Sequence, residues 1–307
     1  MPAITIPTNF TFLNSEELTN RVKDIKHRIE DLGIGVCLSA SFDGMFMEQN
    51  RPYTKTLDFD INTYRDENYY NKVFEFCATE ACGLHPMIYS RDIDKWKQNF
   101  LWFQEKMEQF DIPWYGLYLL QVRNEEWTSE NIKDLMEFVE FLFEWSWERV
   151  GHNLDYFMEF MLEQHGFNIM TNSFNIIGRG LTCGLQNTLT VRLSDLMIYP
   201  CHRTGYKQYY CGQFIPDEEK VLRYQNINAE LLITSYGVHR EMLPSCYECP
   251  INKLCTGQCL GASHESNNNL FVPIPSVCMV AYAIAAASIK GLINIGVYGH
   301  YMANTDA

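Results

Sequence analysis

The sequence has few cationic side chains for its size. It holds 24 Lys and Arg against 38 Asp and Glu in 307 residues, and its formal net charge is −14. This excess of negative charge argues against non-specific binding to nucleic acid and against attraction to an anionic membrane surface. We therefore expect neither nucleic acid nor membrane among the partners.

Long hydrophobic runs are also missing, and no signal-peptide pattern opens the chain. The most apolar run, residues 277–289, is too short to span a bilayer and is followed by Lys290 and Gly291. A hydrophobic content of 47%, with 14% aromatic residues, excludes general disorder. These features predict a folded, cytoplasmic protein.

Strand-like and helix-like patterns alternate through the first 150 residues. The expected strands are residues 3–13, 35–42, 84–90 and 114–122, and the expected helices are residues 15–32, 69–78, 93–110 and 129–150. Four consecutive strand–helix units predict a parallel sheet with helical crossovers, which is an α/β fold.

Two of these helices carry more specific signals. Asn14 is the expected N-cap of the first helix, with Glu17 three residues later in the position of a capping box. The third helix places four apolar side chains on one face, the pattern of an amphipathic helix with one buried face. They are Trp96, Phe100, Phe103 and Met107.

Cysteine is unusually abundant, and the second half of the chain holds most of it. Four of the 11 cysteines form a C-x2-C-x5-C-x3-C block within residues 246–259. Thiolates at such spacing collect soft metal, either zinc or an iron–sulfur cluster. Disulfides are disfavoured in the reducing compartment expected here. The seven cysteines of interest are Cys183, Cys201, Cys246, Cys249, Cys255, Cys259 and Cys278.

A hairpin is expected between Cys183 and Cys201. Its arms are residues 189–193 and 197–199, and residues 194–196 form the turn. The ends of a hairpin lie close together, so these two cysteines can approach each other while the later block supplies further ligands. Pro250 follows Cys249, as proline often follows a ferredoxin ligand.

This order of cysteines resembles the SPASM domain of radical S-adenosylmethionine enzymes, with all seven cysteine positions present. Leu196 stands in the turn where the family usually has glycine. The resemblance implies two four-iron clusters. Cys183, Cys201 and Cys259 would bind the inner cluster, for which Cys211 is the nearest candidate fourth ligand unless one iron is open to substrate. The outer cluster would take Cys246, Cys249, Cys255 and Cys278.

The resemblance extends into the first half of the chain. Thr8-Asn9-Phe10 stands where the third barrel strand of the family ends, and Ser41-Phe42-Asp43-Gly44 matches the Ser-x-Asp-Gly after the fourth strand. Asn50-Arg51-Pro52-Tyr53 follows where an arginine is expected. By resemblance, Ser41, Asp43 and Arg51 are candidate cofactor contacts, and the first half corresponds to the last four units of a six-unit partial barrel.

The first two units of such a barrel are absent. The sequence has neither the C-x3-C-x2-C loop, which in the family binds the cluster that cleaves S-adenosylmethionine, nor the Gly-Gly-Glu motif. Cys37, Cys77 and Cys82 do not replace that loop, and we interpret them as small apolar core residues. A parallel sheet lacking two strands would expose an unpaired edge at residues 4–12. We therefore expect a partner chain or a second copy to cover it.

The sequence thus predicts a partial parallel (β/α) barrel missing its first units, followed by a small cysteine-rich α+β domain of SPASM type. Its parts are residues 1–150 for the strand–helix units, 151–182 for a helical linker, 183–279 for the auxiliary-cluster domain and 280–307 for a C-terminal helix and tail.

Three functions remain open at this point. By resemblance, the first is a radical S-adenosylmethionine maturase acting on peptide or protein side chains. It would carry two [4Fe-4S] clusters and would use S-adenosylmethionine only if the missing half is supplied. The second is a non-catalytic iron–sulfur protein for binding or electron transfer, derived from that family. The third is a zinc-stabilised interaction module.

Overall fold

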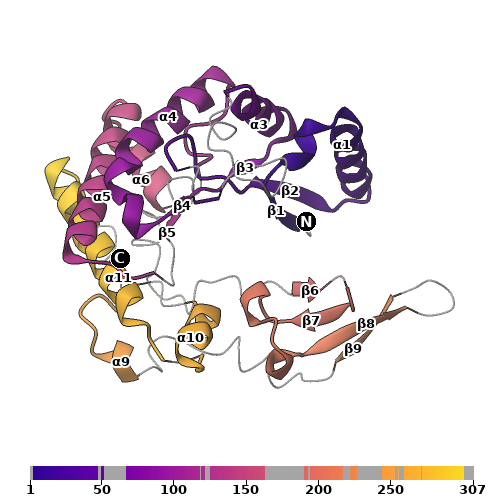
Figure 1. Ribbon diagram of the computed structural model, residues 1–307. Helices are drawn as coiled ribbons and strands as arrows, with labels where there is room; N and C mark the ends of the chain where they lie inside the picture. Colours follow the sequence, from indigo (N-terminus) through magenta and orange to yellow (C-terminus); the bar gives the residue numbers. More distant parts are fainter. Residues whose placement is uncertain are drawn as a thin grey trace. The chain divides into compact units, whose positions relative to one another are not determined.

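The structure is a computed structural model in which the chain forms two compact units (Figure 1). Unit 1 comprises Met1–Thr171 and Ala286–Ala307, and unit 2 comprises Asn172–Ala285. The residues that the structure describes are 3–47, 50–51, 67–117, 119–121, 125–162, 190–192, 194–216, 222–226, 244–252, 255, 259–270 and 272–300.

The described strands of unit 1 pair in parallel. The sheet β1-β2-β3 consists of Ala3–Thr8, Gly35–Ala40 and Gly83–Leu84, and a second pair joins β4 (Met87–Ile88) to β5 (Leu120–Gln121). The register runs from Ala3 opposite Gly35 to Thr8 opposite Ala40. A parallel bridge from Leu84 to Leu117 connects the two strand groups.

Helices follow these strands in the order that the sequence patterns predict. They are α1 (Glu16–Glu30), α3 (Glu67–Glu80), α4 (Trp96–Gln109), α5 (Ser129–Arg149) and α6 (Leu154–Leu162), with 3-10 turns η1 (Thr11–Asn14) and η2 (Ser90–Lys95). In Figure 1 the helices α1, α3 and α4 lie on one side of the strands of this unit.

Several predictions of element bounds were wrong. The strand expected at residues 3–13 is β1, which ends at Thr8, and Thr11–Asn14 forms η1 instead. A strand was expected at residues 114–122, whereas β5 comprises Leu120–Gln121. The N-cap of α1 is Ser15, whose hydroxyl accepts the backbone N–H of Leu18, because Asn14 belongs to the preceding 3-10 turn. The expected strand at residues 84–90 is two short strands separated by His85 and Pro86. Proline cannot donate to a strand ladder, and Pro86 therefore marks the break.

Aromatic side chains form the core of unit 1, as the face of the third predicted helix indicated. Trp96, Phe100, Phe103 and Met107 are all fully buried on α4, which confirms that prediction. The ring of Phe74 on α3 packs edge-on against Phe103, and Phe100 packs against Trp145 of α5. Such contacts fix the helices relative to one another and to the sheet.

One edge of this unit is far less covered. The side chains of Ile4 and Ile6 on β1 are 41% and 42% exposed, and β1 is the outer strand of its sheet. On α1, Leu18 and Ile25 are also exposed, and Lys26 is the only described residue of the helix that is buried. The apolar stripe of α1 therefore lacks the covering that the stripe of α4 has.

Unit 2 contains an antiparallel sheet in the order β6-β7-β8-β9. Its strands are Thr190–Arg192, Met197–Tyr199, Gly212–Pro216 and Leu222–Asn226. Thr190 pairs with Tyr199, which confirms the predicted hairpin. Short helices follow the sheet or interrupt it: η4 (His202–Thr204), η5 (Lys207–Tyr209), α9 (Pro244–Tyr247) and α10 (Leu260–Asn267).

The last long helix, α11 (Pro275–Asn294), is long and apolar enough to cross a membrane by length and composition alone. Its Gly291 packs against the Phe143 ring of α5, and Lys290 forms a 2.7 Å ion pair with Glu140 of the same helix. Ala287 and Leu292 are buried. These contacts are those of a helix that packs in a protein core.

Two glycines allow a specific test of the packing between the turn after β2 and helix α4. Gly33 and Gly44 both have positive φ, +77° and +96° respectively. A Cβ on Gly33 would meet nothing within 4 Å, whereas one on Gly44 would lie 2.5 Å from Oδ1 of Asn99 and 2.7 Å from the Phe103 ring.

We therefore expect Gly33→Ala to lower the free energy of unfolding by about 1–2 kcal/mol, because alanine disfavours the left-handed backbone conformation at this position. Gly44→Ala should cost a further 1–3 kcal/mol, roughly, for overpacking. Denaturant unfolding followed by tryptophan fluorescence measures the difference, because all six Trp lie in residues 96–147 of unit 1. Equal losses in the two variants would contradict tight packing around Gly44.

Candidate functional site

The candidate cofactor contacts of the first half lie at the carboxyl ends of the parallel strands. Ser41 directly follows β2, and its backbone N–H donates to the Thr8 carbonyl at 2.8 Å. Asp43 and Gly44 form the turn after this strand, and Asn50 and Arg51 come a few residues later. Ligands of open α/β sheets bind at this edge, beyond the carboxyl ends of the strands.

Asp43 and Arg51 lie in direct contact. The Asp43 side chain is completely buried, and Nη2 of Arg51 lies 2.5 Å from its Oδ1. Nε of Arg51 donates to both carboxylate oxygens at 3.0 Å, and the backbone N–H of Met87 donates to Oδ1 at 2.7 Å. Burial raises the pKa of Asp43, and the hydrogen bonds and charge of Arg51 oppose that rise.

The same arginine also reaches the next strand connection. Its Nη2 donates to the His85 carbonyl at 2.6 Å, and its side chain is 26% exposed. In the described part of the chain, the hydrogen bonds of Arg51 use Nε and Nη2. Nη1 is thus available in the described part of the chain for an oxygen ligand such as a carboxylate or phosphate.

Asn99 and His85 complete this cluster, and the sequence patterns did not single out either of them. Nδ2 of Asn99, on α4, donates to the Asp43 carbonyl at 2.7 Å, and its Oδ1 accepts the Phe46 N–H at 3.4 Å. Burial and the nearby charge of Arg51 lower the pKa of His85 to about 4. His85 is therefore neutral at pH 7.

A second group of polar side chains extends the cluster along the strand ends. Nδ2 of Asn50 donates to Asp92 at 3.0 Å, and Arg91 binds both Asn50 and Glu125. Glu125 also accepts the Ser90 N–H at 2.7 Å. This network connects the loops after β2, β4 and β5, and it gives the carboxyl edge a rigid polar rim.

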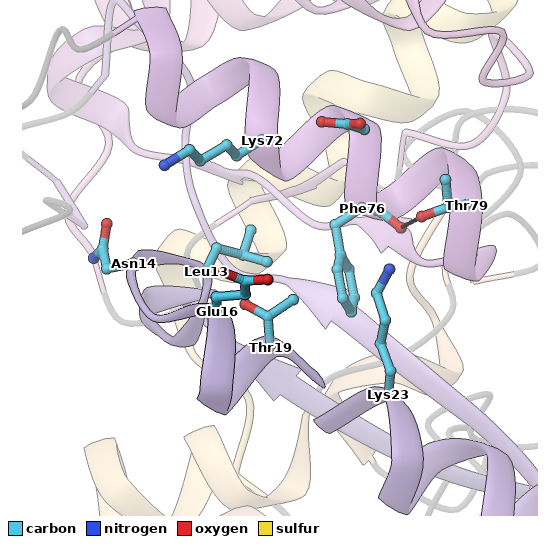
Figure 2. A pocket seen from close by; sticks show the side chains of 9 residues that line it. Leu13, Asn14, Glu16, Thr19, Lys23, Lys72, Phe76 and Thr79 are labelled. Atoms are coloured by element: carbon cyan, nitrogen blue, oxygen red, sulfur yellow. Dashed lines mark hydrogen bonds between the residues drawn. The ribbon is translucent and has the colours of Figure 1, made fainter. Parts of the chain in front are cut away.

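A cavity in the described part of unit 1 lies away from the Asp43 cluster. It has a volume of about 470 Å³ and opens between η1, α1 and α3. Figure 2 shows Lys72 and Phe76 of α3 across from Leu13 and Thr19. Its two lysines, Lys23 and Lys72, are balanced by Glu16 and Glu75. The cavity therefore has no preference for a charged ligand, and none of its lining residues belongs to the Asp43 cluster.

The seven candidate metal ligands all belong to unit 2. One of them, Cys183, falls outside the described residues. Within the described part, no three His, Cys, Asp or Glu side chains form a group that could hold a metal. Residues 253–254 and 256–258, which flank Cys255, also fall outside it. Four of the candidate ligands lie in pairs on neighbouring elements.

The first pair is Cys201 and Cys259, which begin two helices that pack together. Cys201 is the N-cap of η4, and its Sγ accepts the Arg203 N–H at 3.5 Å. Cys259 is the N-cap of α10. A Cβ on Gly261 would lie 2.4 Å from the Cβ of Arg203, and Arg203 forms a 2.8 Å ion pair with Glu265. Glycine thus permits close approach of the two helices just after the two thiols.

The second pair is Cys249 and Cys278. Sγ of Cys249 lies 3.8 Å from the hydroxyl of Tyr282, which stands one turn after Cys278 on α11. The hydrogen bond to Cys249, burial, and the charges of the Cys249 and Cys278 thiolates raise the pKa of Tyr282. Both sulfurs therefore lie near one hydroxyl. Cys246 joins Cys249 through a turn in which the Cys249 N–H donates to the Cys246 carbonyl at 3.2 Å.

Cys211 points into the sheet of unit 2. Its side chain is completely buried, its thiol donates to the Ile198 carbonyl at 3.1 Å, and burial raises its pKa. This position makes Cys211 a structural thiol in the described arrangement. His202 is exposed, although its Nδ1 lies 3.7 Å from Sγ of Cys201.

Comparison with known proteins gives one partial similarity. Over 87 residues, 27% of this chain, the sequence is 31% identical to a cysteine-type anaerobic sulfatase-maturating enzyme of Clostridium perfringens. The match spans 22% of the length of that relative. No family model matches the chain.

The half-buried His85, which is neutral at pH 7, predicts a defined pH dependence of stability. An unfolded histidine binds its proton near pH 6.5, whereas the folded protein resists protonation down to about pH 4. As the pH falls from about 6.5 to about 4, the unfolded state binds more protons, and the free energy of unfolding decreases. Below about pH 4 the contribution of His85 levels off.

His85→Gln should remove this part of the pH dependence. Denaturant titrations of wild type and variant between pH 7.5 and 4 measure it as the difference between the two slopes. His152→Gln, at a position where the side chain is 55% exposed, serves as the control for loss of an imidazole. Parallel pH profiles for wild type and His85→Gln would contradict a half-buried, neutral His85.

Proposed function

We propose that this chain is part of a radical S-adenosylmethionine/SPASM-type maturase that modifies peptide or protein side chains. It would supply two auxiliary [4Fe-4S] clusters and part of the barrel, with the radical-generating cluster missing. The observation that carries the proposal is the seven-cysteine order around a hairpin, together with the partial similarity to a maturase of that family.

The donor chemistry of unit 2 fits this assignment. All seven proposed ligands are thiols, the ligand type that four-iron clusters take. Cys201 already accepts a backbone N–H, and hydrogen bonds to sulfur tune cluster potentials. The pairs Cys201 with Cys259 and Cys249 with Cys278 each fall within one of the two proposed ligand sets. Auxiliary clusters would bind substrate or carry electrons away from it.

The turn of the hairpin retains the backbone conformation that glycine usually supplies. Leu196 has φ +58°, and its N–H donates to the Arg192 carbonyl at 2.8 Å. Arg192 pairs with Asp195 through both carboxylate oxygens, and Asp195 Oδ1 accepts the Met197 N–H at 3.1 Å. These bonds hold a turn whose left-handed residue costs about 1–2 kcal/mol. The departure from glycine thus leaves the hairpin intact.

In unit 1 the proposed role of the Asp43 cluster is to hold S-adenosylmethionine if the radical-generating half is supplied. Asp43 would act through Arg51, because its own carboxylate is saturated by Arg51 and the Met87 N–H. Arg51 would present its remaining N–H groups to a ligand carboxylate. Ser41 lies at the same strand end. The peptide substrate would be bound at this polar edge.

The uncovered edge of unit 1 supports a partner that supplies a strand and a helix. Such a unit would continue the parallel sheet beside β1 and would cover Leu18 and Ile25 on α1. A partner chain or a second copy of this chain, pairing along β1, would supply this cover.

A second candidate is a non-catalytic iron–sulfur protein derived from the same family, and one observation favours it. The 307 residues contain no C-x3-C-x2-C triplet. Cofactor affinity separates the two functions, because only the maturase needs S-adenosylmethionine. A zinc-stabilised interaction module is the third possibility, and it is distinguished by metal content.

Metal analysis of anaerobically purified protein tests the cluster assignment. We expect about eight irons and eight sulfides per chain, with visible absorption that bleaches on reduction. Cys255→Ser should lower the iron content to about four, because it removes one ligand of the outer cluster only. Cys77→Ser is the matched control and should leave the iron unchanged. Zinc without visible absorption would exclude both iron–sulfur functions.

Light scattering after size exclusion tests the uncovered edge. We expect the isolated chain to associate with rising concentration through β1, and Ile6→Lys to reduce that association by placing a charge on the edge strand. Ile215→Lys, on β8 of unit 2, is a matched control because both isoleucines are 42% exposed. A wild type that stays monomeric at high concentration, or equal effects of both variants, would contradict a role for β1.

A further inference from the structure

Cys77 and Cys82 meet at the carboxyl end of α3, outside the seven proposed cluster ligands. Ala81 has φ +51°, and the N–H of Cys82 donates to the Cys77 carbonyl at 3.0 Å. Cys82 is the second residue after the helix, and Cys77 lies three residues before the C-cap Glu80; a hydrogen bond between these two positions, across a left-handed residue, defines a Schellman motif. In this motif the side chains of these two positions frequently contact each other. The helix ending therefore places the two thiols side by side.

The separation of the two residues suits a disulfide. The 3.0 Å bond between N of Cys82 and O of Cys77 limits their Cα–Cα distance to at most about 7 Å, given standard bond lengths. Disulfides span about 4.4–6.8 Å between Cα atoms. Both residues are buried, at 2% and 7% exposure. Closing the bond thus requires little movement of the backbone.

The surroundings favour one thiolate of the pair. The hydrogen bond from Cys77 lowers the pKa of Cys82, and the charge of Lys26 lowers it further, against the opposing effects of burial and Glu80. The pKa of Cys77 is raised by the same hydrogen bond, by burial and by the charges of Cys82 and Cys37. Of the two thiols, Cys82 ionises more readily, which makes it the nucleophilic sulfur of the pair; when protonated, it donates to the Glu80 carbonyl at 3.7 Å.

Ion pairs fix the position of Lys26, the residue whose charge lowers the pKa of Cys82. Its side chain is 9% exposed and forms ion pairs with Glu30 at 3.0 Å and with Glu80 at 3.4 Å. Glu80 is also paired with Lys23 and with His27. The buried end of α3 is therefore closed by a charge network rather than by apolar packing alone.

We propose that Cys77 and Cys82 form a reversible dithiol–disulfide pair that hydrogen peroxide oxidises. The Cys82 thiolate attacks one peroxide oxygen and the O–O bond breaks, which gives a sulfenic acid on Cys82 and hydroxide. The hydroxide takes up from solvent the proton that Cys82 released on ionising, and leaves as water. Sγ of Cys77 then attacks Sγ of Cys82. The S–O bond breaks, a second water leaves with the Cys77 proton, and the S–S bond forms. Two electrons pass from the thiols to the peroxide, and an external dithiol reverses the change.

Tryptic mapping of the full chain tests this pairing directly. The peptide spanning residues 73–91 holds Cys77 and Cys82 and no other cysteine, and the peptide spanning residues 29–55 holds only Cys37. After brief treatment with dilute peroxide and alkylation under denaturing conditions, we expect peptide 73–91 to lose two hydrogens and to take no alkyl group. Dithiothreitol should restore double alkylation, and peptide 29–55 should stay singly alkylated.

Three serine variants assign the roles. Cys82→Ser should leave Cys77 fully alkylated after peroxide, and Cys77→Ser should leave Cys82 overoxidised beyond rescue by dithiothreitol. Cys37→Ser should not change the disulfide. The same chain in urea should lose the selectivity for peptide 73–91, because the helix ending no longer holds the thiols together.

Two results would overturn the proposal. One is a doubly alkylated peptide 73–91 in the peroxide-treated wild type, which shows that the pair does not oxidise. The other is a disulfide between Cys82 and Cys37, which shows that the Schellman contact does not select the partner. Because the measurement reads only these two peptides, it is independent of cluster content and of the proposed maturase function.

Discussion

The buried carboxylate of Asp43 is the constraint on which unit 1 depends. A charge with no exposure must be paired and hydrogen-bonded, because its desolvation is otherwise prohibitive. Arg51 and the Met87 N–H satisfy its side chain, and Asn99 satisfies its carbonyl. One residue thereby ties the end of β2 to the start of β4 and to helix α4. The positive φ of Gly44 lets the chain turn beneath Asn99 without a side chain in the way.

Sequence patterns predicted the elements of this unit better than its connections. The buried face of α4 followed from its periodicity, because a 3.6-residue repeat of large apolar side chains has one stable location. The Asp43–Arg51 pair was approached only through family resemblance, since nothing local relates an aspartate to an arginine eight residues later. His85 and Asn99 carried no signal. Their importance arises from contacts between segments far apart in the sequence.

The errors in element bounds have the same origin. Asn14 and Ser15 are both good N-caps, and the choice between them depends on the 3-10 turn that Thr11 begins. The strand expected at residues 84–90 is broken at Pro86, because proline has no N–H to donate to the strand ladder. The prediction was wrong because it gave more weight to the apolar pattern of this segment than to the proline. In unit 2 the hairpin was predictable from alternation and turn residues. Its left-handed Leu196 was not, because leucine disfavours that conformation and local hydrogen bonds compensate.

Two pairs of cysteines differ in their position relative to a helix end. Cys259 is the N-cap of α10, and Cys278 lies in the first turn of α11. Cys77 and Cys82 stand at the carboxyl end of α3, where the dipole opposes ionisation. A thiolate on Cys82 is stabilised there by a hydrogen bond from the Cys77 thiol and by the positive charge of Lys26. In the proposed roles, the pair at the carboxyl end of α3 would exchange between thiols and a disulfide, and the two cysteines at amino ends would ligate clusters.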